Sequence, residues 1–173
     1  MSTDSLYVFT AGCNGMKIHP FITLLHMNSI RLVIDTRLNT HYQYVGEFGG
    51  KKLKAHLDEA EITYLHDRRF APTKEMRDFW ENDKSNNAWG DFLDTYSLNL
   101  QVEDPIKNDP KLAELIINSE RILLLCTEPH FEDCHRSETA EYFKDSFGNV
   151  VVEHLMTNKP KRDAHKRITR GLR

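Results

Sequence analysis

The chain has 173 residues, of which 39% are hydrophobic and 28% charged, and its net charge is −3. This length suits one domain with a single core, and the composition excludes a low-complexity protein. No apolar run approaches the roughly 20 residues of a membrane-spanning helix, and the first residues lack the features of a signal peptide. The three cysteines are an odd, low count that fits a reducing compartment. We therefore expect a soluble, cytoplasmic protein.

The first half of the chain alternates apolar strand segments with amphipathic helices. Strands are expected at residues 6–9, 32–34 and 62–65. A helix with Pro20 in its first turn follows the first strand, and a helix at 51–60 follows the second. This order of strands and helices is typical of α/β proteins with a parallel sheet.

The second half begins with a helical insert at about residues 66–110, with helices around 76–80 and 89–98. A further helix starts at Pro110 and turns Leu115, among other apolar residues, toward the core. It leads to the most informative part of the chain, residues 121–155.

The apolar run 122–125 must be buried on both faces, as expected of a central parallel strand. Asp133 is a good N-cap for the next helix, which Gly148 ends before a last strand at 150–152. The first turn of that helix would hold three polar residues, Cys134, His135 and Arg136. The sequence therefore predicts a single α/β domain over residues 1–157, with a mainly parallel sheet flanked by helices.

Residues 158–173 form a separate, basic C-terminal arm with seven Lys and Arg residues against one acid, Asp163. Such an excess is typical of a segment that binds phosphate groups, although a solvated terminus would have the same composition. The arm residues expected to contact nucleic acid are Lys159, Lys161, Arg162, Lys166, Arg167 and Arg170.

Polar residues follow each predicted strand, and parallel sheets bind ligands at the carboxyl ends of their strands. We therefore expect these segments to share one edge of the sheet. They are Thr10-Ala11-Gly12-Cys13-Asn14, Asp35-Thr36-Arg37, His66-Asp67-Arg68 and the stretch 126–136.

These motifs resemble the family catalogued as domain of unknown function 488, over roughly residues 6–155. The matching elements are Thr10-Ala11-Gly12, Asp35-Thr36-Arg37, Phe48, Leu125-Cys126-Thr127-Glu128 and Cys134-His135-Arg136-Ser137. The first turn departs from the family pattern, because Cys13 stands where an aromatic residue is usual. The resemblance assigns no reaction, so the chemistry must be argued from the site.

Asp35 ends a buried strand, which places its carboxylate at the sheet edge near the core. One interpretation makes it a general base, or a group that stabilises a developing positive charge. The other makes it a structural carboxylate bonded to loop N–H groups or to Arg37. The sequence leaves both open.

Cys134, His135 and Arg136 at a helix start would form an anion site. Free backbone N–H groups, the helix dipole and a guanidinium would together attract phosphate or carboxylate. The alternative is that Arg136 forms a buried bridge with Glu128 or Asp35.

The loop at residues 38–50 offers ring faces and amide donors, which suit a flat heterocycle such as a nucleobase. An ordinary loop would instead fold its aromatic residues onto the core. The loop residues concerned are Asn39, His41, Tyr42, Tyr44 and Phe48.

Cys126 and Cys134, with His135, suggest either metal ligands or a nucleophilic thiol. A metal would need a fourth ligand, such as Cys13 or His66. The cysteine spacing is not that of zinc knuckles, and the zinc-deaminase pattern is absent. A third reading is that the cysteines act as small buried hydrophobic residues.

Together these features predict a hydrolase that cleaves an N-glycosidic bond in a nucleotide or nucleic acid, with DNA favoured. Such a reaction develops positive charge on the sugar, which a carboxylate stabilises, while the departing base needs a donor. Asp35 would be the base or stabiliser, and His41 or Asn39 would assist the leaving group. No metal or other cofactor is required.

The other candidate residues would bind substrate. They are Thr10, Gly12, Arg37, Tyr42, Tyr44, Phe48, Cys126, Glu128, Cys134, His135 and Arg136. Two other classes remain open. One is a Cys-dependent enzyme of sulfur or phosphoryl transfer, similar to rhodaneses and Cys phosphatases, and the other is a non-catalytic module that binds a nucleotide or anion.

Overall fold

A computed structural model describes residues 5–41, 43–83, 85 and 87–155. Five parallel strands form one sheet in the order β3-β2-β4-β1-β5. The strands are β1 (Leu6–Gly12), β2 (Leu32–Asp35), β3 (Thr63–His66), β4 (Arg121–Cys126) and β5 (Val150–His154). The predicted α/β fold with a parallel sheet is therefore confirmed.

In the described part of the chain, six α-helices connect the strands. They are α1 (Ile18–Met27), α2 (Gly50–Glu59), α3 (Lys74–Asn82), α4 (Ala88–Glu103), α5 (Pro110–Ser119) and α6 (Arg136–Phe147). Short 3₁₀ turns occur at η1 (Gln43–Phe48), η2 (Arg68–Phe70) and η3 (Phe131–Asp133). The helical insert between β3 and β4 is confirmed, and none of the described helices is long and apolar enough to cross a membrane.

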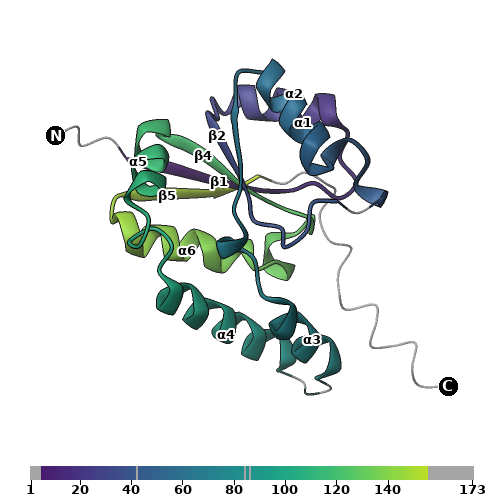
Figure 1. Cartoon of the computed structure of the whole chain (residues 1–173), viewed down its shortest axis with the longest axis vertical. Coiled ribbons are helices and arrows are strands. Elements are labelled where there is room, and N and C mark those ends of the chain that lie inside the picture. The colour runs from purple at the N-terminus through teal and green to yellow at the C-terminus, as the bar shows by residue number, and fades with distance from the viewer. Residues whose placement is uncertain (1–4, 42, 84, 86, 156–173) are drawn as a thin grey trace.

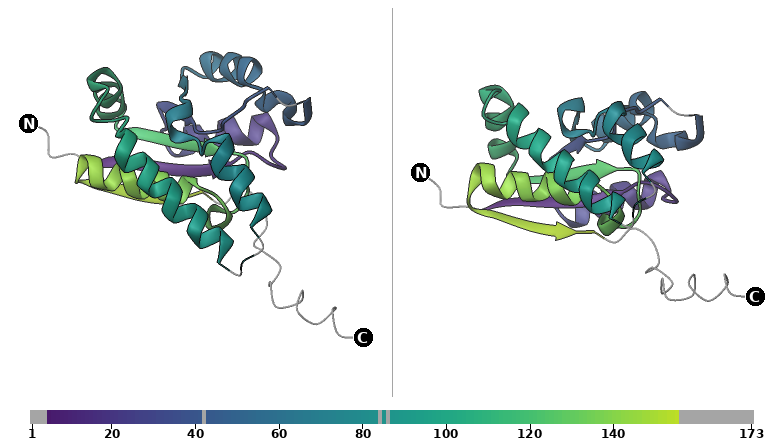
Figure 2. Two further views of the ribbon diagram at one scale, coloured as in Figure 1. Left: turned by 60° about the horizontal axis from the view of Figure 1, so that its bottom comes forward. Right: turned by 90° about the horizontal axis from the view of Figure 1, so that it is seen from below.

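The helices cover both faces of the sheet, as Figures 1 and 2 show. Helices α1 and α2 pack on one face, and α4, α5 and α6 pack on the other. The central strand β4 supplies both cores, because Leu123 and Leu125 join the first and Ile122 and Leu124 join the second. Burial on both faces explains why its sequence is an unbroken apolar run.

The chain leaves the adjacent strands β1 and β4 in opposite directions, toward β2 and β5 respectively, which makes their carboxyl ends the switch point of the sheet. The backbone of the two loops fills the space at this switch point. The Cys13 N–H donates to the Cys126 carbonyl at 2.9 Å, and a side chain at Gly12 would overlap the Glu128 carbonyl oxygen. The open space therefore lies further along the same edge, between the loops after β2 and β4.

Three local predictions are wrong. Strand β1 runs to Gly12 rather than ending at residue 9, because it pairs with β4 as far as Cys126. Leu115 is 36% exposed rather than turned inward. Helix α6 begins at Arg136 with His135 as its N-cap, since a 3₁₀ turn ending at Asp133 and an extended Cys134 precede it. Asp133 is therefore not its N-cap.

Candidate functional site

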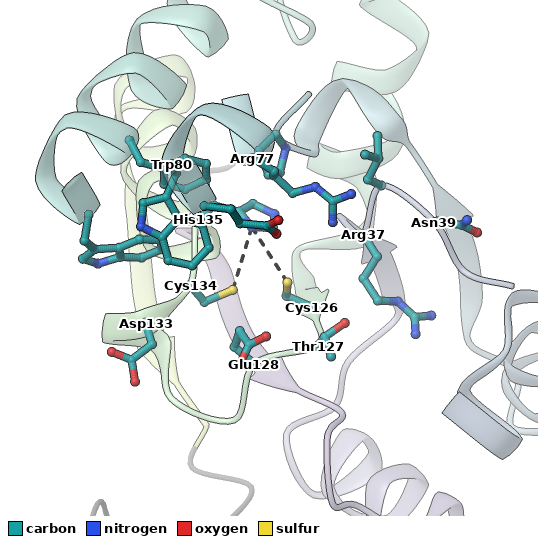
Figure 3. A pocket seen from close by; sticks show the side chains of 15 residues that line it. Arg37, Asn39, Arg77, Trp80, Cys126, Thr127, Glu128, Asp133, Cys134 and His135 are labelled. Atoms are coloured by element: carbon teal, nitrogen blue, oxygen red, sulfur yellow. Dashed lines mark hydrogen bonds between the residues drawn. The ribbon is translucent and has the colours of Figure 1, made fainter. Parts of the chain in front are cut away.

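A pocket of about 480 Å³ lies at the carboxyl edge of the sheet, between the β2 and β4 loops and helices α3 and α4 (Figure 3). This volume is within the range of small-molecule sites in proteins. Cys126, Cys134 and His135 line one part, and Trp80, Trp89 and Phe92 line another. The remaining polar lining comes from Arg37, Asn39, Arg77, Glu81, Thr127, Glu128 and Asp133.

The orientation of the His135 ring follows from its contacts. Its Nε2 lies 3.2 Å from the Thr36 carbonyl oxygen, which only accepts hydrogen bonds, so Nε2 carries a proton. Its Nδ1 lies 3.9 Å from the Cys126 sulfur and 4.0 Å from the Cys134 sulfur (Figure 3). In the neutral ring, therefore, a nitrogen lone pair faces both thiols.

The two cysteines differ in acidity. A hydrogen bond from Cys134 holds the pKa of Cys126 well below its usual value, against the effect of burial, and the positive charges of a protonated His135 and of Arg136 act in the same direction. Burial raises the pKa of Cys134, and its hydrogen bond to Cys126 adds to the effect. The pair thus favours a Cys126 thiolate beside a Cys134 thiol.

Among the described residues, two thiols and one imidazole form a group that could hold a metal ion. The ligand atoms of Cys126, Cys134 and His135 all lie within 4.8 Å of one another. Neither Cys13 nor His66 belongs to this group. Cys13 instead lies 3.8 Å from Arg37 Nη1, and His66 donates from Nε2 to the Arg37 carbonyl at 2.7 Å.

Asp35 lies outside this pocket lining. Its side chain is fully buried and accepts from Arg37 Nε at 2.8 Å, from Arg37 Nη2 at 2.5 Å and from the Tyr64 hydroxyl at 2.7 Å. The carboxylate also raises the pKa of Arg37, which keeps the guanidinium charged despite burial. This geometry matches the structural reading of Asp35, in which it fixes Arg37 and the β2 loop.

Arg136 is 1% exposed, and its guanidinium is engaged by protein groups. It donates to the carbonyl oxygens of Glu128 at 2.5 Å and Pro129 at 3.2 Å, and to Thr10 Oγ1 at 3.3 Å. Arg136 thus ties the β4 loop to the end of β1. Because Arg136 bonds to the backbone carbonyl of Glu128, the Glu128 carboxylate remains available to line the pocket.

Glu128 is an exposed acid in the lining of the pocket. Burial raises the pKa of this carboxyl group, and the nearby Cys126 acts in the same direction, while Arg136 opposes the shift. A carboxyl group with a raised pKa can hold a proton nearer neutral pH, as a general acid requires.

The aromatic wall is a packed cluster on α3 and α4. Trp80 and Trp89 have ring centroids 5.3 Å apart, and Phe92 stacks on Trp89 at 5.0 Å. The Trp89 indole N–H donates to the Glu132 carbonyl at 3.1 Å, which ties the insert to the β4 loop. A pocket role of these tryptophans could not be predicted from the sequence, because both flank polar tracts in which no motif marks a site.

A second cavity of about 470 Å³ adjoins the first and shares Leu38, Asn39 and Arg77 with it. Its cationic or imidazole lining consists of His41, His66, Arg68, Lys74 and Arg77. No carboxylate of the described residues is part of that lining. The Nε atom of Arg77 is buried and has no hydrogen-bond partner.

The remaining sequence candidates are distributed around these cavities. Thr10 is buried and bonds to His154 Nδ1 at 2.9 Å, and Gly12 provides the close approach of two loops. Phe48 is buried in the core against Phe21, at 5.1 Å between ring centroids. Tyr42, the side chain of Tyr44 and the whole basic arm, 158–173, lie outside the described residues.

The fold and site define an α/β protein with an all-parallel sheet and a pocket that joins two thiols, an imidazole and an indole wall. The family model described as domain of unknown function DUF488 matches residues 17–143. The chain therefore belongs to that family, as its motifs suggested. No curated protein and no solved structure matches it.

Proposed function

We propose that this protein is a hydrolase that acts on a nucleotide or nucleic acid by cleaving an N-glycosidic bond. The observation that carries the proposal is the joining of two cavities, one with an indole wall and one with a cationic lining. A nucleotide has two parts that complement these cavities: a flat base for the indole wall and an anionic phosphate for the cationic lining. We propose that the base occupies the first cavity and the phosphate the second.

The indole wall supports the base position, because a flat heterocycle stacks favourably on aromatic side chains regardless of its identity. Asn39 lies where the two cavities meet and offers an amide that can pair with a base edge. Together these features favour a base held by stacking and fixed in orientation by a few polar contacts.

The cationic cavity supports the phosphate position. Arg77 lines both cavities, and none of the ion pairs formed among the described residues includes it. Arg68 and Lys74 add positive charge, and His41 and His66 add imidazole donors. A guanidinium with unused donors binds phosphate in a bidentate manner.

Glu128 takes the acid role in this proposal, because it is a carboxyl group of the pocket lining whose pKa is raised. As the N-glycosidic bond breaks, the Glu128 proton would pass to the nitrogen of the departing base. A water molecule would then bond to the sugar carbon and return a proton to the Glu128 carboxylate. Asp35, the carboxylate first considered, acts indirectly by holding Arg37 in place. His41 lines only the cationic cavity, so we assign it to phosphate rather than to the leaving group.

Product analysis tests the reaction. The full-length protein is incubated with nucleosides, nucleotides and DNA carrying normal or modified bases, and released base and phosphate are quantified separately. We expect free base, lost in Glu128→Gln and kept in Glu153→Gln, an exposed acid on β5 away from the pocket. Phosphate or sulfur-transfer products, or tight binding without product, would reject the N-glycosidic reaction.

The base position is tested by Trp80→Leu, with Phe79→Leu as the matched control. Both residues lie on α3, but only Trp80 lines the pocket. Stacking on an aromatic side chain contributes about 1–3 kcal/mol per base. We therefore expect Trp80→Leu to weaken nucleotide binding roughly 5- to 150-fold, and Phe79→Leu to leave it unchanged.

A second candidate is a Cys-dependent enzyme of sulfur or phosphoryl transfer. It is favoured by the lowered pKa of Cys126, which Cys134 and His135 sustain. A thiolate at a strand end beside an imidazole is a typical nucleophile arrangement. Cys126→Ser should abolish transfer in this case, and a trapped covalent adduct on Cys126 would identify the intermediate.

The nucleic-acid part of the proposal rests on the composition of the basic arm. Deleting residues 158–173 should lower DNA affinity and flatten its dependence on salt, because each phosphate contact releases counterions. Mononucleotide binding should be unaffected. Unchanged DNA affinity and salt dependence would rule out the arm as a phosphate binder.

A further inference from the structure

We propose that Cys126, Cys134 and His135 bind a divalent metal ion of the zinc class, with its fourth coordination position open to the pocket. This inference concerns the same pocket as the proposed function but does not depend on the reaction. Two thiolates and an imidazole are a ligand set that favours zinc over magnesium or calcium.

The spacing of the three ligand atoms fits a tetrahedral site. With metal–sulfur and metal–nitrogen bonds of about 2.3 and 2.0 Å, a tetrahedral ion would place sulfur and nitrogen about 3.5 Å apart. The observed separations from His135 Nδ1 are 3.9 Å to Cys126 Sγ and 4.0 Å to Cys134 Sγ. A contraction of a few tenths of an ångström would therefore complete the geometry.

The His135 ring is already set for ligation. Metal-binding imidazoles usually donate their other ring N–H to a carbonyl or carboxylate, which fixes the tautomer and the ring plane. The Thr36 carbonyl accepts that bond from Nε2. The opposite ring nitrogen is the one that faces both sulfur atoms, as the dashed lines in Figure 3 mark.

The ligands lie at the ends of regular secondary structure. Cys126 ends the central strand β4, and His135 is the N-cap residue of α6, with Cys134 directly before it. Each is at most 8% exposed. A purely hydrophobic role for the cysteines leaves out their contact with the Nδ1 lone pair, which a thiol proton satisfies in the metal-free protein and a metal ion would satisfy when bound.

The fourth position distinguishes a catalytic from a structural metal site. Structural zinc sites have four protein ligands, whereas catalytic sites have three and leave one position for water or substrate. All three ligands line the pocket, and no fourth His, Cys or carboxylate of the described residues joins the group. A bound ion would therefore contact a molecule in the pocket directly.

Metal content of the full-length protein, measured without any substrate, tests the site. The protein is purified without chelator, equilibrated with Zn²⁺ and passed through gel filtration, and bound metal is quantified. We expect one ion per chain. Titration of the metal-free protein with Co²⁺ should produce the sulfur-to-cobalt charge-transfer absorption of thiolate ligation and the visible bands of tetrahedral cobalt.

Cys126→Ser, Cys134→Ser and His135→Asn should each weaken metal binding by more than the about 10–100-fold typical of changes outside the ligand shell. Cys13→Ser is the matched control, because Cys13 is also a buried thiol but lies beside Arg37 and outside the group. It should retain full metal binding and the cobalt spectrum.

The outcomes are separable from those of the hydrolase test. A metal content well below one ion per chain in the wild-type protein, with no cobalt charge-transfer band, would overturn the metal site. This result does not depend on whether the variants fold. Rapid reaction of Cys126 with a thiol reagent in the folded, zinc-equilibrated protein would do the same. A bound metal with no base release would instead preserve the site and reject the reaction.

Discussion

Asp35 and Arg37 form a buried ion pair at the end of β2, with two N–H groups of the arginine on the two oxygens of the carboxylate. The pair is closed on its other sides by the Tyr64 hydroxyl and the Phe48 carbonyl. It holds the backbone between them, which includes Thr36, and the Thr36 carbonyl in turn accepts from His135. The ion pair thus supports the position of the imidazole from the strand next to β4.

Asp35→Asn should strongly destabilise the fold, because it leaves a buried guanidinium without its counter-charge. Breaking a buried pair by removing one partner costs about 3–5 kcal/mol. Urea unfolding followed by circular dichroism measures the loss. The control is Asp67→Asn, whose partner Arg69 is 43% exposed and should contribute less. Equal losses in the two variants would contradict the role given to Asp35.

In the metal-free protein, the neutral His135 ring should be the Nε2-protonated tautomer. The reason is the bond from Nε2 to the Thr36 carbonyl, which accepts but cannot donate. Long-range ¹H–¹⁵N correlation spectra of labelled protein distinguish the tautomers. A proton on Nδ1 of the neutral ring would refute this arrangement and with it the readiness of that nitrogen for a metal.

Gly12→Ala should disrupt the joint between the β1 and β4 loops. The new methyl group would overlap backbone atoms of Glu128 and Pro129, which cannot move aside as a side chain can. Overpacking costs about 1–3 kcal/mol, and unfolding by urea should show at least this loss.

Gly90→Ala is the matched control for that change. Its methyl group would meet only the end of the Asn87 side chain, and alanine favours a helix over glycine by up to about 1 kcal/mol. We expect Gly90→Ala to be neutral or stabilising. If it destabilised as much as Gly12→Ala, the cost would not come from the close backbone approach.

His154 should make the protein less stable as the pH falls below about 6.5. Burial lowers the pKa of this imidazole, and the charge of Arg136 acts in the same direction. The unfolded chain therefore takes up the proton at a higher pH than the folded chain, so stability falls from the unfolded pKa of about 6.5 down to the folded value.

Urea unfolding at about pH 7.5 and 5.5 measures this effect in the wild type and in His154→Gln. The wild type should lose more stability between the two conditions than the variant. Thr10 and Phe131 contact the ring, so the substitution itself changes stability. The quantity compared is therefore the change in stability between the two pH values within each protein. An identical pH dependence would mean that another group titrates.

The hydrophobic pattern predicted the strands, the core helices and the parallel sheet, because the spacing of apolar residues along a segment reflects whether one or both of its faces are buried. The edge that carries the site followed from the same rule, since parallel strands place their carboxyl ends together. The start of α6 was misplaced because Asp133 has the chemistry of an N-cap, while a 3₁₀ turn took up the backbone before it.

The sequence by itself determined the fold class, the family and the group of segments that meet at one edge of the sheet. Only the tertiary structure decided which polar groups are already satisfied. Asp35 and Arg136 are occupied by internal partners, whereas Glu128 and Arg77 line open cavities. It also brought Trp80 and Trp89 from the insert over the thiols, across more than 30 positions of chain. Side-chain chemistry is local, but hydrogen-bond satisfaction and pocket walls depend on contacts between distant segments, which residue spacing does not encode.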